Sequence, residues 1–230
     1  MRSVAAISAA HGRNAITRAW GLHTSTLGFS SVIVAVTDDE ANDENARVLS
    51  EMGLTVIRRA NSPLSDKFQS ALDACPRTDA YMILPSDDFV HPTWMKAVTQ
   101  ARLPYMLPSN MAMYDINTGR ALTMATPFHI GGRLKYGACR VFSHAVRKAV
   151  NPLWPSGHER GLDSLSHRRI MEEIGGAVFD MVPSPSFVDI KSKDNLWGYG
   201  SYEKNHASMD PAAATDHITN AEARALLGLT

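Results

Sequence analysis

The sequence has few cysteines and no surplus of charge. Two cysteines, Cys75 and Cys139, occur among 230 residues, and they form neither a Cys-X-X-Cys motif nor a zinc-ligand spacing with histidine. This usage favours structural thiols in a reducing compartment over a disulfide framework. Lysine plus arginine and aspartate plus glutamate balance at 23 each, so no overall field favours nucleic acid, membranes or acidic partners. Any such partner must be bound by a local patch.

Long apolar segments are also missing. Residues 1–10 are mildly apolar, but the polar stretch 11–14 follows too early for a signal-peptide core with its cleavage site. No apolar run approaches the length needed to span a bilayer. We therefore expect a soluble, cytoplasmic protein, and a chain of this length can bury a sizeable core without disulfides or a structural metal.

The short motifs of several enzyme classes are absent as well. There is neither a Gly-X-Gly-X-X-Gly fingerprint after the first expected strand nor a Gly-Lys-Ser/Thr loop, so neither device holds a phosphate group. The nine histidines show no His-Glu-X-X-His or His-X-X-X-His spacing, so the sequence predicts no zinc site. No serine or cysteine lies in a recognisable nucleophile elbow.

The first hundred residues alternate short β-rich runs with amphipathic segments. This order is typical of βα units that feed a largely parallel sheet flanked by helices, so the expected fold class is α/β. The second half is less regular, and a hairpin at residues 117–119 predicts an antiparallel element. The strands are expected at 4–8, 31–36, 54–57, 80–84, 177–182 and 187–190, and the main helices at 14–27, 43–53, 62–75, 93–101 and 162–174.

Polar clusters follow three of the expected strands. They are Ala9-Ala10-His11, Asp38-Asp39 and Asp87-Asp88. Because the carboxyl ends of parallel strands lie at one edge of a sheet, these clusters are expected to converge on a ligand site. Burying two adjacent carboxylates is unfavourable unless a cation with oxygen ligands compensates them, so Asp87-Asp88 indicates a divalent metal. The alternative is a solvated Asp-Asp turn that caps the next helix.

Two of these segments carry a family resemblance. Val36-Thr37-Asp38-Asp39 is similar to the acidic turn after the second strand of the metal-dependent, nucleotide-sugar glycosyltransferases with the GT-A (Rossmann-like) fold, especially the family 2-like group. The stretch 84–92, Leu-Pro-Ser-Asp-Asp-Phe-Val-His-Pro, resembles that family's Asp-X-Asp-Asp motif with its following proline. Pro85 stands where the full motif has its first aspartate, which leaves one carboxylate fewer. The resemblance covers residues 3–100 well and 101–192 loosely.

The resemblance implies roles for individual residues. Asp38 or Asp39 would accept a hydrogen bond from the nucleobase, commonly uracil. Asp88 would ligate Mn²⁺ or Mg²⁺ bridging the diphosphate, with Asp87 near the ribose and the metal, and the ion would act as Lewis acid and template. Lys67 would approach the base or the phosphates, although a solvated helix lysine is the alternative. The remaining nucleotide-binding candidates are Ala9, His11, Arg13 and Ser86.

The catalytic base is expected at the start of a late helix. In inverting members of the family a carboxylate in this place deprotonates the acceptor hydroxyl, and Asp163 occupies it here. A carboxylate in a first helical turn also simply favours the helix dipole. Glu159 and His158 are close substitutes, since either can accept a proton if its surroundings shift its pKa.

Basic residues in the second half suggest an anionic partner. Arg133, Lys135 and Arg140 could bind an anionic acceptor such as nucleic acid, although cationic surface decoration is the alternative. Lys191 could reach the phosphates, and His206 could complete a metal shell.

The resemblance implies a domain division as well as a reaction. Residues 1–192 would form one domain, with a nucleotide-binding half at 1–100 and an acceptor half at 101–192, and 193–230 would be a tail or lid. We expect a glycosyltransferase that moves a sugar from a nucleotide diphosphate donor, UDP-linked, to an acceptor hydroxyl with inversion. A nucleotidyltransferase and a catalytically silent nucleotide-binding domain are the alternatives.

Overall fold

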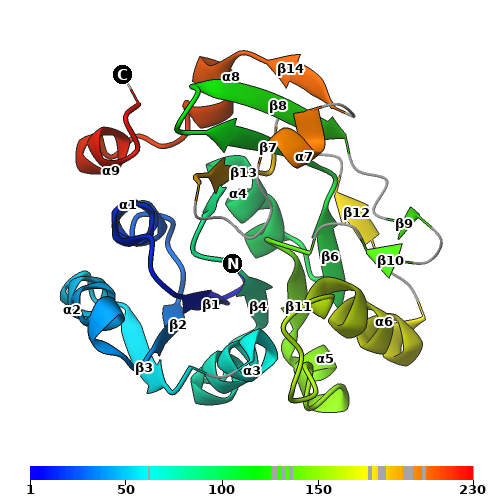
Figure 1. Ribbon diagram of the computed structural model, residues 1–230. Helices are drawn as coiled ribbons and strands as arrows, with labels where there is room; N and C mark the ends of the chain where they lie inside the picture. The colour runs from blue at the N-terminus through cyan, green and yellow to red at the C-terminus, as the bar shows by residue number, and fades with distance from the viewer. Residues whose placement is uncertain are drawn as a thin grey trace.

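The computed structural model describes most of the chain and shows a layered α/β architecture (Figure 1). The described residues are 1–61, 63–125, 129–130, 133–134, 137–175, 178–180, 185–193, 199–203 and 206–229. None of the helices in these segments combines the length and apolarity that a membrane crossing requires.

A seven-stranded sheet forms the centre of the molecule, in the order β12-β6-β11-β4-β1-β2-β3. All its pairings are parallel except those of β11, which runs antiparallel to β4 and β6. The predicted mostly parallel sheet with an antiparallel element is therefore confirmed, although the antiparallel strand is β11 and the hairpin at residues 117–119 belongs to another sheet. Its strands are β1 (Val4–Ala10), β2 (Ser31–Thr37), β3 (Thr55–Arg59), β4 (Ala80–Ile83), β6 (Tyr105–Pro108), β11 (Val141–Ser143) and β12 (Val178–Asp180).

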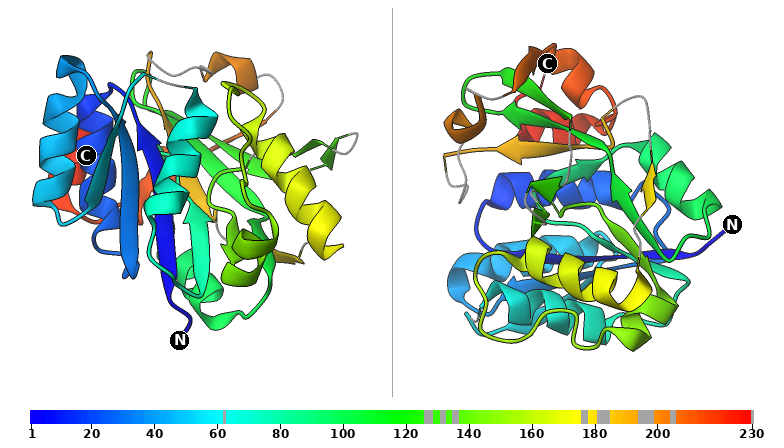
Figure 2. Two further views of the ribbon diagram at one scale, coloured as in Figure 1. Left: turned by 90° about the horizontal axis from the view of Figure 1, so that it is seen from below. Right: turned by 90° about the vertical axis from the view of Figure 1, so that its right-hand side faces the viewer.

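Helices cover both faces of this sheet (Figures 1 and 2). All seven residues of β1 are buried, because alternate side chains enter the cores on opposite faces. One core takes α1 (Asn14–Thr24), α2 (Asp43–Glu51) and α4 (Pro92–Gln100), and the other takes α3 (Leu64–Ala74), α5 (His144–Ala149) and α6 (Leu162–Ile174).

A second, five-stranded sheet packs on the first core, in the order β14-β8-β7-β13-β5. The expected hairpin is confirmed, since β7 and β8 pair antiparallel on either side of Gly119, whose φ of +65° suits glycine. Asp88 does not lie in the turn after β4 but begins β5, the edge strand of this sheet. The strands are β5 (Asp88–Val90), β7 (Asn110–Asp115), β8 (Arg120–Ala125), β13 (Phe187–Lys191) and β14 (Ala207–Met209).

The described part of the segment expected to be a tail or lid contributes to the same core. Strand β14 pairs with β8, and α9 (Ala221–Leu226) lies beside α1 (Figure 1). Ala214 in α8 (Pro211–Thr215), Ile218 between the two helices and Ala223 in α9 are fully buried. These contacts hold β14, α8 and α9 on the face of the central sheet that carries α1.

Candidate active site

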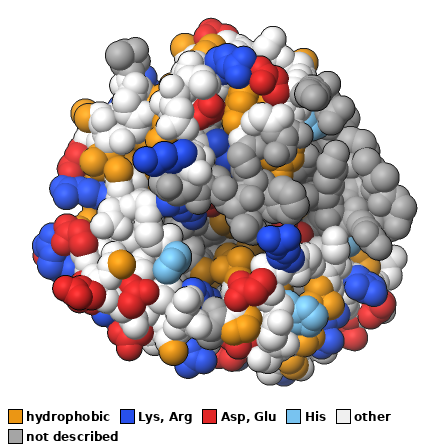
Figure 3. Space-filling view, viewed as in Figure 1, with side chains coloured by type: hydrophobic (Ala, Val, Ile, Leu, Met, Phe, Trp, Pro, Cys, Tyr) orange, Lys and Arg blue, Asp and Glu red, His pale blue; other side chains and the backbone are white. Residues whose placement is uncertain are grey.

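A pocket of about 520 Å³ opens at the carboxyl ends of β1 and β4, between the N-termini of α3 and α6. Figure 3 shows this face hollowed near its centre, with basic and acidic side chains around the hollow. Seven predicted site residues line the pocket, namely Ala9, His11, Arg13, Lys67, Ser86, Asp87 and Asp163, whereas Asp38, Asp39 and Asp88 do not. Glu159, Lys191 and Arg140, also considered above, line it too.

Arg13 joins the ends of the two central strands. It precedes α1 in the left-handed backbone conformation, with φ of +49°. Its Nη1 lies 2.6 Å from Asp87 Oδ2, and its Nη2 donates to Ser86 Oγ at 3.4 Å. Burial opposes ionisation of Asp87, but Arg13 and Lys191 together hold its pKa below the ordinary value. Asp87 is thus a stable anion at the pocket wall.

Asp88 and Asp189 oppose each other across the antiparallel pair of β5 and β13. Burial raises the pKa of Asp88 well above the ordinary value, and the charges of Asp189 and Asp87 raise it further. Burial also raises the pKa of Asp189, to about 6, although Lys191 opposes the shift with its Nζ at 2.6 Å from Asp189 Oδ2. Asp189 Oδ1 is buried and has no hydrogen-bond partner.

The balance of charge beneath the pocket therefore favours an added cation. Three buried carboxylates face two cationic groups, Arg13 and Lys191. In the described segments their oxygens do not all come within 4.8 Å of one another. A divalent ion would accordingly be held by one or two of the carboxylates, with the remaining oxygen ligands from a bound phosphate or water.

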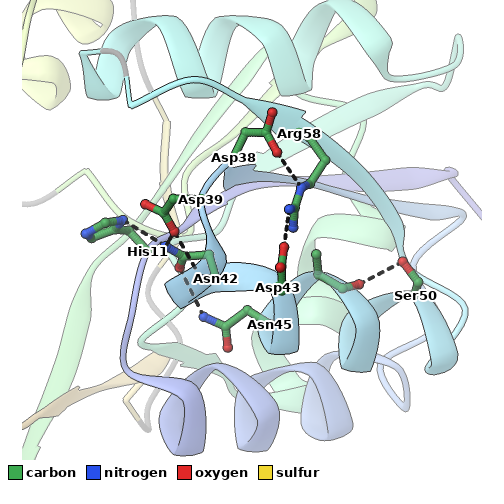
Figure 4. A network of polar contacts seen from close by, with 9 residues as sticks. His11, Asp38, Asp39, Asn42, Asp43, Asn45, Ser50 and Arg58 are labelled. Atoms are coloured by element: carbon green, nitrogen blue, oxygen red, sulfur yellow. Dashed lines mark hydrogen bonds and ion pairs between the residues drawn. The ribbon is translucent and has the colours of Figure 1, made fainter.

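The two aspartates after β2 point in different directions (Figure 4). Asp38 accepts from Arg58 Nε at 2.9 Å, and its side chain is 58% exposed. Asp39 accepts from the Asn42 amide at 3.0 Å and from Asn42 Nδ2 at 2.6 Å, next to His11. Neither aspartate lines the pocket, whereas His11 does. Asp39 is thus the one nearer the pocket wall.

Lys67 reaches the end of β2 from the first turn of α3. Its Nζ donates to Thr37 Oγ1 at 2.8 Å and to Asn61 Oδ1 at 3.4 Å, and the residue is 5% exposed. Burial lowers its pKa, although Glu159 and Asp39 raise it. Lys67 is a buried lining residue and not a solvated helix lysine.

Asp163 lies in the first turn of α6, at the opposite wall of the pocket. Arg140 donates from Nη1 to the Asp163 carbonyl at 2.8 Å and from Nη2 to Ser166 Oγ at 2.6 Å, and Nη2 lies 3.4 Å from Asp163 Oδ1. Gly137 lets the chain pass closely, since a Cβ there would lie 2.1 Å from that Oδ1. The Asp163 side chain remains 46% exposed, so solvent and ligands can reach it.

The basic cluster expected to bind an anionic acceptor is not a surface patch as far as the structure describes it. Arg140 is fully buried, because its guanidinium holds the start of α6. The side chains of Arg133 and Lys135 lie outside the described residues. Nothing in the described structure supports a nucleic acid acceptor.

Three other candidates have distinct positions. Glu159 lines the pocket, and its Oε2 accepts from the Leu64 amide at 3.3 Å, at the start of α3. The main chain of His158 bonds to Ser65, and His158 does not line the pocket. His206 lines a separate pocket with Arg120 and Tyr199.

Sequence reasoning missed Asp189, Trp154 and Arg160 as site residues. Asp189 had a usable signal, because Asp189 and Lys191 are two residues apart in an apolar strand and so share one of its faces. Trp154 and Arg160 lie in the irregular stretch before α6, where periodicity gives no direction for a side chain.

Comparison with known proteins supports the fold. No protein-family model and no curated protein sequence matches the chain. Among solved structures, Staphylococcus aureus TarS 1–349 in complex with UDP matches with a TM-score of 0.57 at 14% identity, over 83% of this chain. The chain spans 61% of the length of that TarS chain.

Two further structures are similar over most of their lengths. Glucosyl-3-phosphoglycerate synthase from Mycobacterium tuberculosis, solved with Mn²⁺, UDP-glucose and phosphoglyceric acid, matches with a TM-score of 0.53 at 13% identity, over 100% of this chain and 81% of that one. A nucleotidyl transferase from Methanothermobacter matches with a TM-score of 0.50 at 15% identity, over 88% and 95%. At such identities the likeness shows the fold alone. The chain has a GT-A-like fold, as the sequence motifs indicated.

Proposed function

We propose that the protein is a glycosyltransferase that moves a sugar from a UDP-linked donor to an acceptor hydroxyl. The observation that carries this proposal is that one pocket of the GT-A-like fold joins the Arg13–Asp87 pair at one wall to Asp163 at the other. A diphosphate needs cationic groups, and Arg13, Lys67 and Lys191 supply them. A reacting sugar between these walls would have its leaving group and its base on opposite sides.

A divalent cation, Mn²⁺ or Mg²⁺, fits the donor end of the pocket. The unpartnered Asp189 Oδ1 and the surplus of carboxylate charge are the features that such an ion would satisfy. Asp88 and Asp87 would hold it, and the ion would also balance the charge of the unpartnered Asp189 carboxylate oxygen. When bound, the ion would offset charge on the departing diphosphate.

Asp163 is proposed as the base of a single displacement. Its carboxylate would take the proton of the acceptor hydroxyl while that oxygen bonds to the anomeric carbon and the bond from carbon to phosphate oxygen breaks. The configuration at the anomeric carbon would be inverted. Arg140 would hold the helix start that carries Asp163, through the Asp163 carbonyl and Ser166.

Thermal stabilisation by UDP, with and without Mn²⁺, tests the donor site. We expect UDP with Mn²⁺ to raise the melting temperature, and Asp88→Asn to lose the manganese-dependent part. Asp73→Asn, an exposed acid on α3, is the matched control and should behave as wild type. No response to any nucleotide would favour the catalytically silent domain, and a response independent of metal would contradict the role of Asp88.

Hydrolysis of UDP-sugars without acceptor tests the base. We expect Asp163→Asn to lower the rate by about 10²-fold or more while UDP affinity is retained. Glu159→Gln is the comparison variant, since Glu159 lines the same pocket but contacts the start of α3. If Glu159→Gln lost hydrolysis and Asp163→Asn did not, the base would be Glu159.

A nucleotidyltransferase is the second candidate, because one solved neighbour of this fold has that activity by name. Such an enzyme is expected to carry a glycine-rich, basic loop after the first strand, and residues 9–13 supply one glycine and one arginine. Release of pyrophosphate from UTP with sugar 1-phosphates, without UDP-sugar hydrolysis, would favour this alternative.

A further inference from the structure

Three potential metal ligands gather away from the pocket, between the start of α4 and the link from α8 to α9. One ligand atom each from His91, Asp216 and His217 lies within 4.8 Å of the others. His217 Nδ1 is 3.6 Å from Asp216 Oδ1, and the rings of His91 and His217 have centroids 4.9 Å apart. We propose that these residues bind one divalent transition-metal ion of the zinc class.

The hydrogen bonds of the two imidazoles show which nitrogen of each ring can bind the ion. His217 Nε2 lies 3.0 Å from the Phe89 carbonyl, which can only accept, so this nitrogen carries the proton and Nδ1 has the free lone pair. His91 Nδ1 accepts from the Thr93 amide at 3.1 Å and lies 2.5 Å from Thr93 Oγ1. Nε2 of the neutral ring therefore carries the proton in the metal-free protein. It becomes a ligand once the proton is on Nδ1, which then donates to Thr93 Oγ1 at the expense of the bond from the Thr93 amide. Histidines that bind metals are usually oriented by such bonds from the second nitrogen.

The donor set selects the kind of ion. Two imidazole nitrogens and one carboxylate suit zinc and similar transition metals, whereas magnesium and calcium prefer oxygen ligands. The side chain of Asp216 is 67% exposed, so an ion can reach the site from solvent. The group also borders a second cavity of about 850 Å³, which leaves room for water at a fourth position.

The ligands of this site come from two parts of the chain, which a bound ion would hold together. His91 comes three residues after Asp88 and caps α4, whereas Asp216 and His217 belong to the C-terminal segment. His217 already bonds the Phe89 carbonyl of β5, and His23 of α1 bonds the Val90 carbonyl at 2.9 Å. A bound ion would fasten the C-terminal helices to the strand that begins with Asp88. Because the ligands are far apart in the sequence, their spacing along the chain gave no zinc signal.

Titration of the full, metal-free chain with Co²⁺ tests the proposal. The protein must carry no histidine tag, since a tag would bind the same ions. We expect one Co²⁺ per chain, visible d–d absorption bands, and displacement by Zn²⁺ but not by Mg²⁺. His91→Gln and Asp216→Asn should each weaken binding at least tenfold and remove the bands. Absent bands, or unchanged binding in both variants, would overturn the site.

Matched control variants distinguish Co²⁺ binding at this site from binding in the pocket, and loss of the site from misfolding. His144→Gln removes a half-buried histidine that bonds Tyr81 on the other side of the sheet, and it should bind Co²⁺ as wild type does. Asp88→Asn should bind it too, whereas loss in Asp88→Asn alone would place the ion in the pocket. Circular dichroism checks folding, and Asp216→Asn alters an exposed side chain.

Hydrogen exchange tests the fastening itself. Zn²⁺ should slow amide exchange at least several-fold in residues 211–227 of the wild type and leave His91→Gln unchanged. Equal exchange with and without Zn²⁺ in the wild type would overturn the fastening role. None of these outcomes depends on glycosyl transfer, so the site and the proposed function can fail separately.

Discussion

Asp189 offers a direct test of the charge balance beneath the pocket. Its side chain is 14% exposed, and it faces Asp88 across β5 and β13. Burial raises its pKa from the ordinary 3.8 to about 6, although Lys191 opposes this. Because one pH unit corresponds to about 1.36 kcal/mol, ionising Asp189 in the metal-free folded protein costs about 3 kcal/mol relative to the unfolded chain.

The sign of the pH dependence follows from the raised pKa. When folding raises the pKa of an acid, the folded state is favoured at pH values below the pKa of the unfolded chain. This contribution to the free energy of unfolding is lost as the pH rises from about 4 through about 6. Asp189→Asn has nearly the same size and no charge. We therefore expect the free energy of unfolding of the chelator-treated variant to exceed that of wild type by about 3 kcal/mol at pH 8, and by under about 1 kcal/mol at pH 4.

Urea unfolding at the two pH values measures this difference. Asp73→Asn, on the exposed face of α3, controls for loss of an acid elsewhere and should show no such gap. An equal difference in the free energy of unfolding at both pH values would mean that the substitution had changed a contact and not an ionisation. No difference at pH 8 would refute the reasoning. Added Mn²⁺ should close the gap at pH 8, because the cation compensates the carboxylate that only wild type carries.

Two further predictions concern the two walls of the pocket. Lys67→Met should weaken UDP affinity about tenfold, because the pocket would lose a buried cation proposed to contact the nucleotide. The salt dependence of binding measured by calorimetry should also fall, and unchanged affinity would count against the role of Lys67. Gly137→Ala should lower UDP-sugar hydrolysis at least tenfold with UDP affinity retained, since the added Cβ would displace the Asp163 carboxylate; equal hydrolysis would show that Asp163 can shift without loss.

The convergence of the site could be predicted from local sequence features. Apolar runs and caps fix the strands and helices of the first hundred residues, and parallel strands then bring their carboxyl ends to one edge. Arg13, Ser86 and Asp87 meet there for this reason, although 13 and 86 are far apart in the chain. Asp163 joins them because α6 begins beside the same edge.

Side-chain direction could not be predicted where it depends on distant pairings. Asp38 and Asp39 are neighbours with the same chemistry, yet Asp38 turns outward because Arg58 of β3 lies beside it. Asp189 became a site residue because β13 pairs with β5 in one particular register. Cross-strand pairing joins segments about a hundred residues apart, and a single sequence gives no periodic signal for it.

The same pairing makes the two adjacent aspartates chemically unequal. Asp87 precedes β5 and pairs with Arg13 at the pocket wall, so its pKa is lowered and it is ionised whether or not a ligand is bound. Asp88 is the first residue of β5 and is 4% exposed opposite another carboxylate, so its pKa is raised. A divalent cation would therefore displace a proton from Asp88, and its affinity should rise with pH. The adjacent pair thus combines one permanent anion, Asp87, with one carboxylate, Asp88, that would ionise when a cation binds.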